Sequence, residues 1–256
     1  MNEKKQGAWL NTCQLMDGIA GLRALPKHSV DMILTDPPYG TTRNSWDVSL
    51  SLPEMWEAIH WAVKPNGAVL LFAQCPFDKV LGVSNLKELR YEWLFIKNQG
   101  TGFLNAHKMP LKQSENILVF YQKLPKYNPQ FTYKAQYSKT KSTKQSSNYG
   151  GFNPSAAVSA DGKRYPTNVL NGVKVQKAVF PTQKPVWLCE YLIKTYTDKG
   201  EIVADLCAGS GTTGIAAMRT GRRYYLFEKD ETIFELARKR LLETEENLKN
   251  GLDQHS

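Results

Sequence analysis

The spacing of apolar and polar residues predicts that strands and helices alternate along the first half of the chain. Short apolar runs predict buried strands at 30–35, 68–73 and 117–121, with a fourth candidate at 91–96. Helices are predicted at 17–25 and 52–63, and the second is expected to end at the stop and turn signal Lys64-Pro65-Asn66-Gly67. Strands that alternate with helices are typical of an α/β sheet.

The pattern is lost from residue 124 to 179, where Pro, Ser, Asn, Gly and Lys dominate, and then returns. The later elements are a helix at 186–196, a strand at 201–206, a helix at 213–220, a strand at 223–227 and a helix at 231–248. We therefore predict one domain in two halves, 1–123 and 179–256, with an insert at 124–178.

The insert also holds the charge of the chain. Ten basic residues and a single acid, Asp161, lie between 123 and 178, so this segment alone carries the whole chain's net charge of +9. Aromatic residues lie between the lysines, a combination that suits phosphates and stacked bases, although a solvated loop stays an open alternative. The predicted nucleic-acid contacts are Lys134, Lys139, Lys141, Lys144, Lys163 and Arg164.

Other composition features exclude several classes. No apolar run approaches the roughly 20 residues that span a bilayer, and the first ten residues lack an apolar leader. The four cysteines and four histidines have neither disulfide nor metal-ligand spacing, so no metal site is expected. These features predict a cytoplasmic protein that has no membrane anchor.

A glycine-rich turn follows the strand at 201–206 and reads Gly209-Ser210-Gly211-Thr212-Thr213-Gly214. Glycines let a ligand approach the backbone, and Glu228, 19 residues after Gly209, stands where an acid can bind ribose hydroxyls. The turn also matches the dinucleotide fingerprint of nicotinamide enzymes, but only 45 residues follow Gly211, too few for the second half of such a sheet. The missing strands must come from the N-terminal half, which predicts a circularly rearranged sheet. A glycine turn without a ligand is the other interpretation.

A second candidate loop, Asp36-Pro37-Pro38-Tyr39, directly follows the strand at 30–35. Open α/β sheets place their ligands at this end of a strand, and the two prolines stiffen the loop. The Asp36 carboxylate and the Pro37 carbonyl can then hold an amino group, while Tyr39 can stack on a base. A base in a duplex reaches such a loop only when it is flipped out. A purely structural turn is the alternative.

Together and in this order, the segments TDPPYG at 35–40 and GSGTTG at 209–214 resemble the β class of DNA amino-methyltransferases. This resemblance covers roughly 8–122 and 180–240. It implies a Rossmann-like seven-stranded sheet, the catalytic half before the cofactor half, and a target-recognition region at 124–178. It also implies methyl transfer from S-adenosylmethionine to adenine N6 or cytosine N4. The DPPY form favours adenine, and the expected partner is double-stranded DNA.

The resemblance assigns roles to individual residues. It implies catalytic roles for Asp36, Pro37, Pro38 and Tyr39. It implies cofactor contacts for Asp205, Cys207, Ala208, Gly209, Ser210, Gly211, Thr212, Thr213 and Glu228, for Thr182 and Lys184 of the segment Pro181-Thr182-Gln183-Lys184-Pro185, and for Thr12 and Cys13. Three positions depart from the family pattern: Thr12, Phe180 and Cys207 stand where the family usually has Asp, His and an aromatic residue.

Several functions stay open at this point. Cytosine N4, RNA adenine, single-stranded DNA and a protein glutamine amide are alternative substrates for the same chemistry. A non-catalytic nucleic-acid-binding protein on a methyltransferase scaffold is the alternative from another class. The recognition sequence, a cognate restriction enzyme, and the choice between monomer and homodimer are not predicted.

Overall fold

The computed structural model describes residues 9–39, 50–135, 137–138, 158–159, 161–173, 178–179 and 182–251. The chain forms two units. The larger one comprises residues 1–128 and 168–256, and the smaller one is Pro129–Thr167. They are described separately below.

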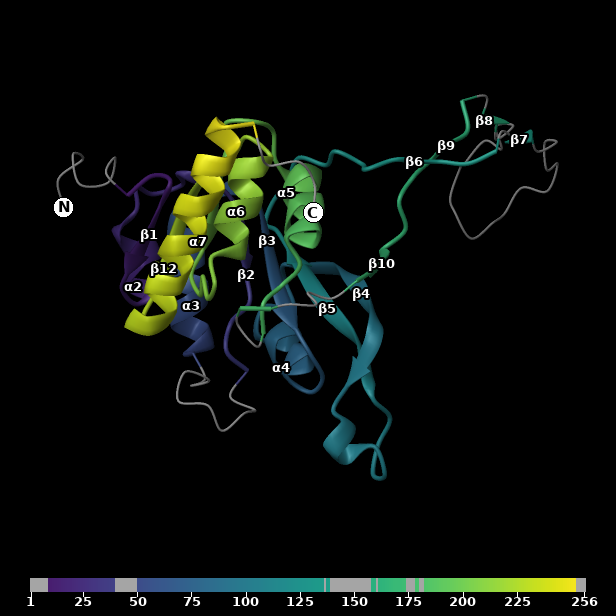
Figure 1. Cartoon of the computed structure of the whole chain (residues 1–256), viewed down its shortest axis with the longest axis horizontal. Coiled ribbons are helices and arrows are strands. Elements are labelled where there is room, and N and C mark those ends of the chain that lie inside the picture. Colours follow the sequence, from purple (N-terminus) through teal and green to yellow (C-terminus); the bar gives the residue numbers. More distant parts are fainter. Residues whose placement is uncertain are drawn as a thin grey trace. The chain divides into compact units, whose positions relative to one another are not determined.

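The larger unit is built on one mixed β-sheet, drawn in Figure 1. Its order is β1 (Thr12–Leu15), β12 (Arg223–Glu228), β11 (Ile202–Asp205), β2 (Val30–Thr35), β3 (Val63–Ala73), β5 (Lys112–Phe120), β4 (Leu89–Thr101) and β10 (Val169–Gly172). Neighbouring strands are parallel except around β5, which is antiparallel to both β3 and β4. The sheet therefore has eight strands where seven were expected, because β10 from the predicted insert pairs with β4.

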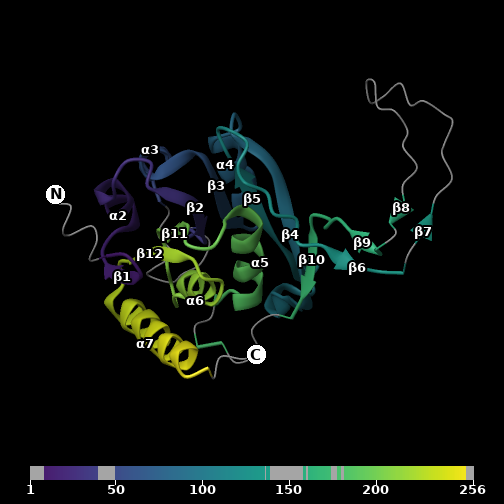
Figure 2. The same ribbon diagram turned by 90° about the horizontal axis from the view of Figure 1, so that it is seen from above.

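Helices cover both faces of this sheet (Figure 2). One layer contains α2 (Gly18–Ala24), α3 (Leu52–Ala62) and α4 (Phe77–Ser84), and the other contains α5 (Val186–Tyr196), α6 (Thr212–Arg219) and α7 (Glu231–Lys249). Side chains alternate between the two faces along each strand. In β3, Leu70 and Phe72 join the core under α5 and α6, whereas Val69 and Leu71 join the core under α2 to α4. None of the described helices is long and apolar enough to cross a bilayer.

The two halves of the chain meet at the centre of the sheet, where β2 pairs with β11. Met32 lies opposite Val203 and Ile33 opposite Ala204, and the backbone N–H of Ile202 donates to Asp31 Oδ2 at 3.0 Å. Because the strands are parallel, the loops that follow them leave the same edge of the sheet. This places the Asp36 loop beside the glycine-rich turn.

Besides β10, the larger unit differs from the pattern-based expectation at three further places. Strand β1 and helix α4 were not predicted, and the turn expected at 64–67 lies within β3. Val63 already pairs with Val30, and the register shifts before Ala68 pairs with Met32. A Cβ at Gly67 would lie 2.8 Å from the carbonyl oxygen of Asp31, so the Pro-Asn-Gly segment forms an irregularity in the strand and does not end it.

The smaller unit contains two short ladders. Strand β6 (Thr132–Tyr133) pairs with β9 (Lys163–Arg164), and β7 (Tyr137–Ser138) pairs with β8 (Val158–Ser159). The Lys163 ammonium lies 3.8 Å from the centre of the Phe131 ring, and the Arg164 guanidinium donates to the carbonyl oxygen of Ala135 at 2.6 Å. Of the predicted nucleic-acid contacts, Lys139, Lys141 and Lys144 lie outside the described residues.

A substitution at Gly18 tests how α2 packs on the sheet. A Cβ there would lie 1.9 Å from the carbonyl oxygen of Leu206, which is backbone and cannot move aside. We expect Gly18→Ala to lower the free energy of unfolding by about 3 kcal/mol, measured by urea denaturation. Gly82→Ala is the matched control, because its Cβ would meet only the side chains of Leu89 at 3.4 Å and Leu118 at 3.9 Å, which are ordinary contacts. Equal stability of the two variants would contradict this packing.

Candidate active site

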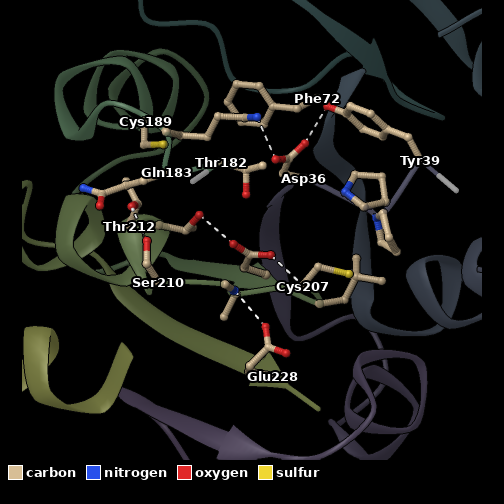
Figure 3. A pocket seen from close by; sticks show the side chains of 18 of the residues that line it. Asp36, Tyr39, Phe72, Thr182, Gln183, Cys189, Cys207, Ser210, Thr212 and Glu228 are labelled. Atoms are coloured by element: carbon tan, nitrogen blue, oxygen red, sulfur yellow. Dashed lines mark hydrogen bonds and ion pairs between the residues drawn. The ribbon is translucent and has the colours of Figure 1, made fainter. Parts of the chain in front are cut away.

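A cavity of about 640 Å³ lies at the edge of the sheet where β2 and β11 end (Figure 3). This volume falls in the range of small-molecule sites, about 300–1,000 Å³. The catalytic-loop residues Asp36, Pro37, Pro38 and Tyr39 all line it. The predicted cofactor residues that line it are Thr182, Lys184, Asp205, Cys207, Ala208, Gly209, Ser210, Thr212, Thr213 and Glu228. The two loops singled out from the sequence therefore share one cavity.

Asp205 anchors the glycine-rich turn from the end of β11. Its carboxylate is buried and accepts three hydrogen bonds, from the Thr35 hydroxyl at 2.6 Å, the Thr213 hydroxyl at 2.7 Å and the Cys207 backbone N–H at 3.0 Å. Burial raises the pKa of Asp205 to about 6, although these three donors oppose the shift. Asp205 thus ties β2, β11 and α6 together beneath the cavity.

The two glycines of the turn serve different purposes. Gly209 has a φ of +51° and a Cβ there would meet no atom closer than 4.0 Å, so it presents bare backbone to the cavity. Gly211, with a φ of +79°, caps α6, and its Cβ would lie 3.2 Å from that of Ala237. Gly211 does not line the cavity, so its geometry serves packing and the turn.

Glu228 ends β12 on the floor of the cavity (Figure 3). Its two carboxylate oxygens accept the backbone N–H groups of Gly209 at 2.9 Å and Asp230 at 3.0 Å. These bonds hold the acid beside the bare backbone of Gly209. Each carboxylate oxygen can accept a further donor, which is what a pair of ribose hydroxyls requires.

Asp36 belongs to a cluster of charged side chains, of which Glu115 is buried and the others are partly buried. The Lys184 ammonium lies 2.6 Å from Asp36 Oδ2 and 3.0 Å from Glu115 Oε1, and the Lys97 ammonium lies 3.5 Å from Glu115 Oε2. Two carboxylates and two ammonium groups balance. Burial raises the pKa of Asp36; Lys184 opposes this shift and Glu115 adds to it. Lys184 was expected to contact the cofactor, and in the structure its ammonium binds the carboxylate of Asp36.

The pKa values of Lys184 and Glu115 in this cluster are shifted in opposite directions. Burial alone would lower the pKa of Lys184, but the carboxylates of Asp36 and Glu115 outweigh it and raise that pKa. Burial alone would raise the pKa of Glu115, but Lys184 and Lys97 outweigh it and hold that pKa below its ordinary value. Both shifts favour the charged form, that of the Lys184 ammonium and that of the Glu115 carboxylate.

Tyr39 is held by two contacts. Its hydroxyl donates to Asp36 Oδ1 at 2.7 Å, and its ring stacks on Phe77 with 5.1 Å between the ring centres. Both contacts stiffen the loop around Asp36. Stacking of Tyr39 on a substrate base stays a prediction.

Some predicted residues lie elsewhere. Thr12 and Cys13 are in β1 and do not line the cavity, and the Thr12 hydroxyl donates to the carbonyl oxygen of Trp9 at 2.6 Å. Their contact with a cofactor stays a prediction. Phe180 and Pro181 lie outside the described residues. The backbone N–H of Cys207 donates to Asp205, and this contact does not use the Cys207 side chain. The turn therefore keeps this hydrogen bond although Cys207 departs from the family pattern.

Sequence reasoning missed other lining residues, which include Asp17, Gly18, Ile19, Phe72, Gln74, Phe95, Lys97, Thr101, Lys112 and Glu115. Asp17 and Gly18 follow β1 directly, so a strand-end rule could have found them had that strand been recognised. Glu115 had a weaker signal, an acid directly before the buried run at 117–120. Among the described residues there is no group of three His, Cys, Asp or Glu side chains suited to a metal ion.

Comparisons with known proteins agree with this geometry. A family model described as DNA methylase, covering enzymes that act on N6 or N4, matches residues 30–239. The chain belongs to this DNA methylase family. The resemblance seen in the sequence is thereby confirmed, and methylation of DNA with S-adenosylmethionine as methyl donor is the chemistry of this family.

Two curated relatives match this DNA methylase along most of its length. It is 27% identical over 246 residues to the type II methyltransferase M2.DpnII of Streptococcus pneumoniae, which covers 86% of this chain and 85% of that protein. It is 25% identical over 239 residues to the DNA adenine methyltransferase YhdJ of Escherichia coli K12, with 88% and 80% covered.

Solved structures share the fold. An M1.HpyAVI–SAM complex has a TM-score of 0.60 at 23% identity and covers 90% of this chain and 98% of that one. The cytosine-N4-specific PvuII DNA methyltransferase has a TM-score of 0.64 at 14% identity, with 93% and 92% covered. The expected Rossmann-like α/β class is confirmed. Because the N4-cytosine enzyme is among these folds, the fold leaves the target base undecided.

The raised pKa of Asp205 predicts a dependence of stability on pH. Between its ordinary pKa of 3.8 and its folded pKa of about 6, the folded state binds more protons than the unfolded one, so stability falls as pH rises through this window. Asp205→Asn removes the effect. We expect its free energy of unfolding, relative to wild type, to rise by about 3 kcal/mol between pH 4 and 7 in urea titrations.

Asp198→Asn is the control for this trend. Asp198 is exposed, and its hydrogen bond from Lys126 holds its pKa below the ordinary value, so the sign of any pH effect is opposite. A flat difference between Asp205→Asn and wild type across pH 4–7 would contradict the shift assigned to Asp205.

The charge cluster predicts strong coupling between Lys184 and Glu115. Lys184→Met leaves two carboxylates that only Lys97 compensates, and we expect a loss of about 3 kcal/mol in unfolding free energy at pH 8. Adding Glu115→Gln restores charge balance, so the double variant should recover more than about 1 kcal/mol of that loss. A double-mutant cycle by urea denaturation measures this. Simple additivity of the two substitutions would refute the coupling.

Proposed function

We propose that this DNA methylase transfers a methyl group from S-adenosylmethionine to the N6 amino group of an adenine that is flipped out of duplex DNA. One observation carries the proposal. The loop suited to hold an amino group and the turn suited to hold a nucleoside line the same cavity. Methyl transfer requires both substrates in one enclosed site with their reacting atoms aligned.

The described residues fit the methyl donor. The bare backbone at Gly209 leaves room that a side chain would fill, and Glu228 beside it has capacity for ribose hydroxyls. Ser210, Thr212 and Thr213 add hydroxyl groups at the start of α6. S-adenosylmethionine supplies an electrophilic methyl group on a sulfonium centre. The contacts assigned to individual residues here are part of the proposal.

Asp36 is the group that holds the amino nitrogen. Its carboxylate accepts a hydrogen bond from the exocyclic NH₂ and stabilises the positive charge that this nitrogen gains as it is methylated. The Lys184 ammonium and the Tyr39 hydroxyl fix the carboxylate's orientation without occupying every acceptor position. No general base is required, because the added proton can pass to water after transfer.

Adenine is favoured over cytosine by the residue at position 36. The family's DPPY form is associated with adenine, and YhdJ, a DNA adenine methyltransferase by name, is a relative over most of the chain. Cytosine N4 is the second candidate, because the PvuII enzyme of that specificity shares the fold. RNA adenine and a protein amide are further alternatives.

The smaller unit, within the insert predicted at 124–178, is proposed to recognise the target. Lys134, Lys163 and Arg164 lie on or beside its β6–β9 ladder, together with Phe131 and Tyr165. Lysine, arginine and aromatic side chains suit contacts with phosphates and bases.

Asp36→Ala tests the catalytic assignment. We expect methyl transfer to unmethylated genomic DNA to fall at least about a hundredfold, because a charge-stabilising group is lost, while the affinity for S-adenosylmethionine changes little. Nucleoside mass spectrometry measures the product and calorimetry measures the cofactor. Glu57→Gln, at an exposed site on α3, is the control for any effect of preparing a variant protein.

The outcomes separate the candidates. N6-methyladenine made by wild type and lost in Asp36→Ala supports the proposal, whereas N4-methylcytosine keeps the mechanism and changes the base. A methylated nucleoside from RNA alone would indicate that RNA is the substrate, and a methylated protein amide would indicate a protein substrate. A wild-type protein that does not bind S-adenosylmethionine would indicate a non-catalytic nucleic-acid-binding protein. Full activity of Asp36→Ala would refute the role of Asp36.

A further inference from the structure

The β4–β5 hairpin extends beyond the sheet at its active-site edge (Figure 1). Strand β3 pairs with β5 only up to Ala73, opposite Asn116, yet the hairpin ladder continues to the pair Thr101–Lys112. Since β2 and β3 are parallel, the hairpin leaves the sheet at the edge where Asp36 follows β2. Lys97, Thr101 and Lys112 at its base line the cavity.

The end of this hairpin, residues 102–111, is called the tip here. It contains a short 3₁₀ helix, Phe103–Asn105, and it exposes large apolar side chains. Leu104 is 99% exposed, Phe103 69% and Met109 50%. Large apolar groups that cluster at one projecting point of a protein mark a surface that becomes covered by a partner.

Charge indicates which partner covers the tip. Residues 98–114 contain Lys108 and Lys112, one histidine and no acid, whereas Lys97 is paired with Glu115, so the apolar tip is flanked by basic residues alone. Lysines suit phosphates, and apolar side chains that enter between base steps unstack them. Both features fit a nucleic-acid duplex and neither requires the smaller unit.

We propose that the tip is a wedge that enters duplex DNA beside the target, with Phe103 and Leu104 filling the space that the flipped base leaves. Lys108 contacts the adjacent backbone phosphate. This inference rests on the proposed function for its substrate, and it assigns duplex opening to a segment outside the insert at 124–178. The pairing of β4 with β5, which shifts register between Ile96 and Thr101, connects the wedge to the cavity that receives the base.

The test compares a duplex with its single strand. The variant Phe103→Ala/Leu104→Ala should bind a fluorescein-labelled 30-base-pair duplex about tenfold or more weakly than wild type, because two apolar side chains lose their burial between bases. Binding to one labelled strand should change less than about twofold, because it has no stack to open. Fluorescence anisotropy measures both affinities. Leu86→Ala, an equally large apolar residue that is 65% exposed before β4, is the matched control and should change neither.

Two further readouts locate the effect. Lys108→Gln should weaken duplex binding and lower the slope of log affinity against log salt by about one, as expected for one lost phosphate contact. With 2-aminopurine at a methylated position mapped by sequencing, wild type should raise fluorescence on binding, and the double tip variant should not. Circular dichroism confirms that the variants fold, which is expected because both tip side chains are exposed.

Each other result overturns the wedge. Equal losses on duplex and single strand would reduce the tip to a general nucleic-acid contact, and unchanged affinities would remove it from the interface. A wild-type dimer that the double tip variant converts to monomer in sedimentation, with duplex affinity retained, would make the tip a self-association surface. The proposed function fails separately: wild type would then give no methylated nucleoside while tip-dependent duplex binding persists.

Discussion

The buried carboxylate of Asp205 is the constraint on which the arrangement of the site depends. It lies where the two halves of the chain meet and accepts hydrogen bonds from Thr35 of one half and from Cys207 and Thr213 of the other. A buried, ionised carboxylate without hydrogen-bond donors would cost folding free energy. The carboxylate of Asp205 therefore requires its three donors, and they in turn fix its position. Because Thr35 directly precedes Asp36, this contact helps the pairing of β2 with β11 to hold the Asp36 loop beside the glycine-rich turn.

The charge cluster extends this connection across the sheet. Lys184 comes from the segment before α5, Glu115 from β5 and Lys97 from β4, and together they reach Asp36 after β2. The Asp36 carboxylate therefore has an electrostatic environment set by three other elements. Strands β4 and β5 also carry the exposed hairpin tip, so the groups around Asp36 are continuous with a part of the chain that extends beyond the sheet.

The sequence predicted the parts of the fold and site that depend on local patterns. The strands at 30–35, 201–206 and 223–227, the glycine turn and Glu228 at a strand end all follow from runs of residues, and the structure has them. Contacts between distant residues could not be predicted this way: no local pattern pairs Lys184 with Glu115, 69 residues away. Strand β1 has only four residues, and β10 lies in a polar segment, so neither shows the alternation of apolar and polar residues that predicts a strand.

The central pairing of β2 with β11 has a consequence for how the chain is made. Thr35 and Asp205 are 170 residues apart, so a chain growing from its N-terminus has β2 long before its partner exists. Strands β2 to β5 can assemble early with α2 to α4, but Leu70 and Phe72 on the other face remain uncovered until α5 and α6 are synthesised. Contacts of such separation slow folding and prolong the exposure of apolar surface. For Leu70 and Phe72 this exposure lasts until α5 and α6 have left the ribosome.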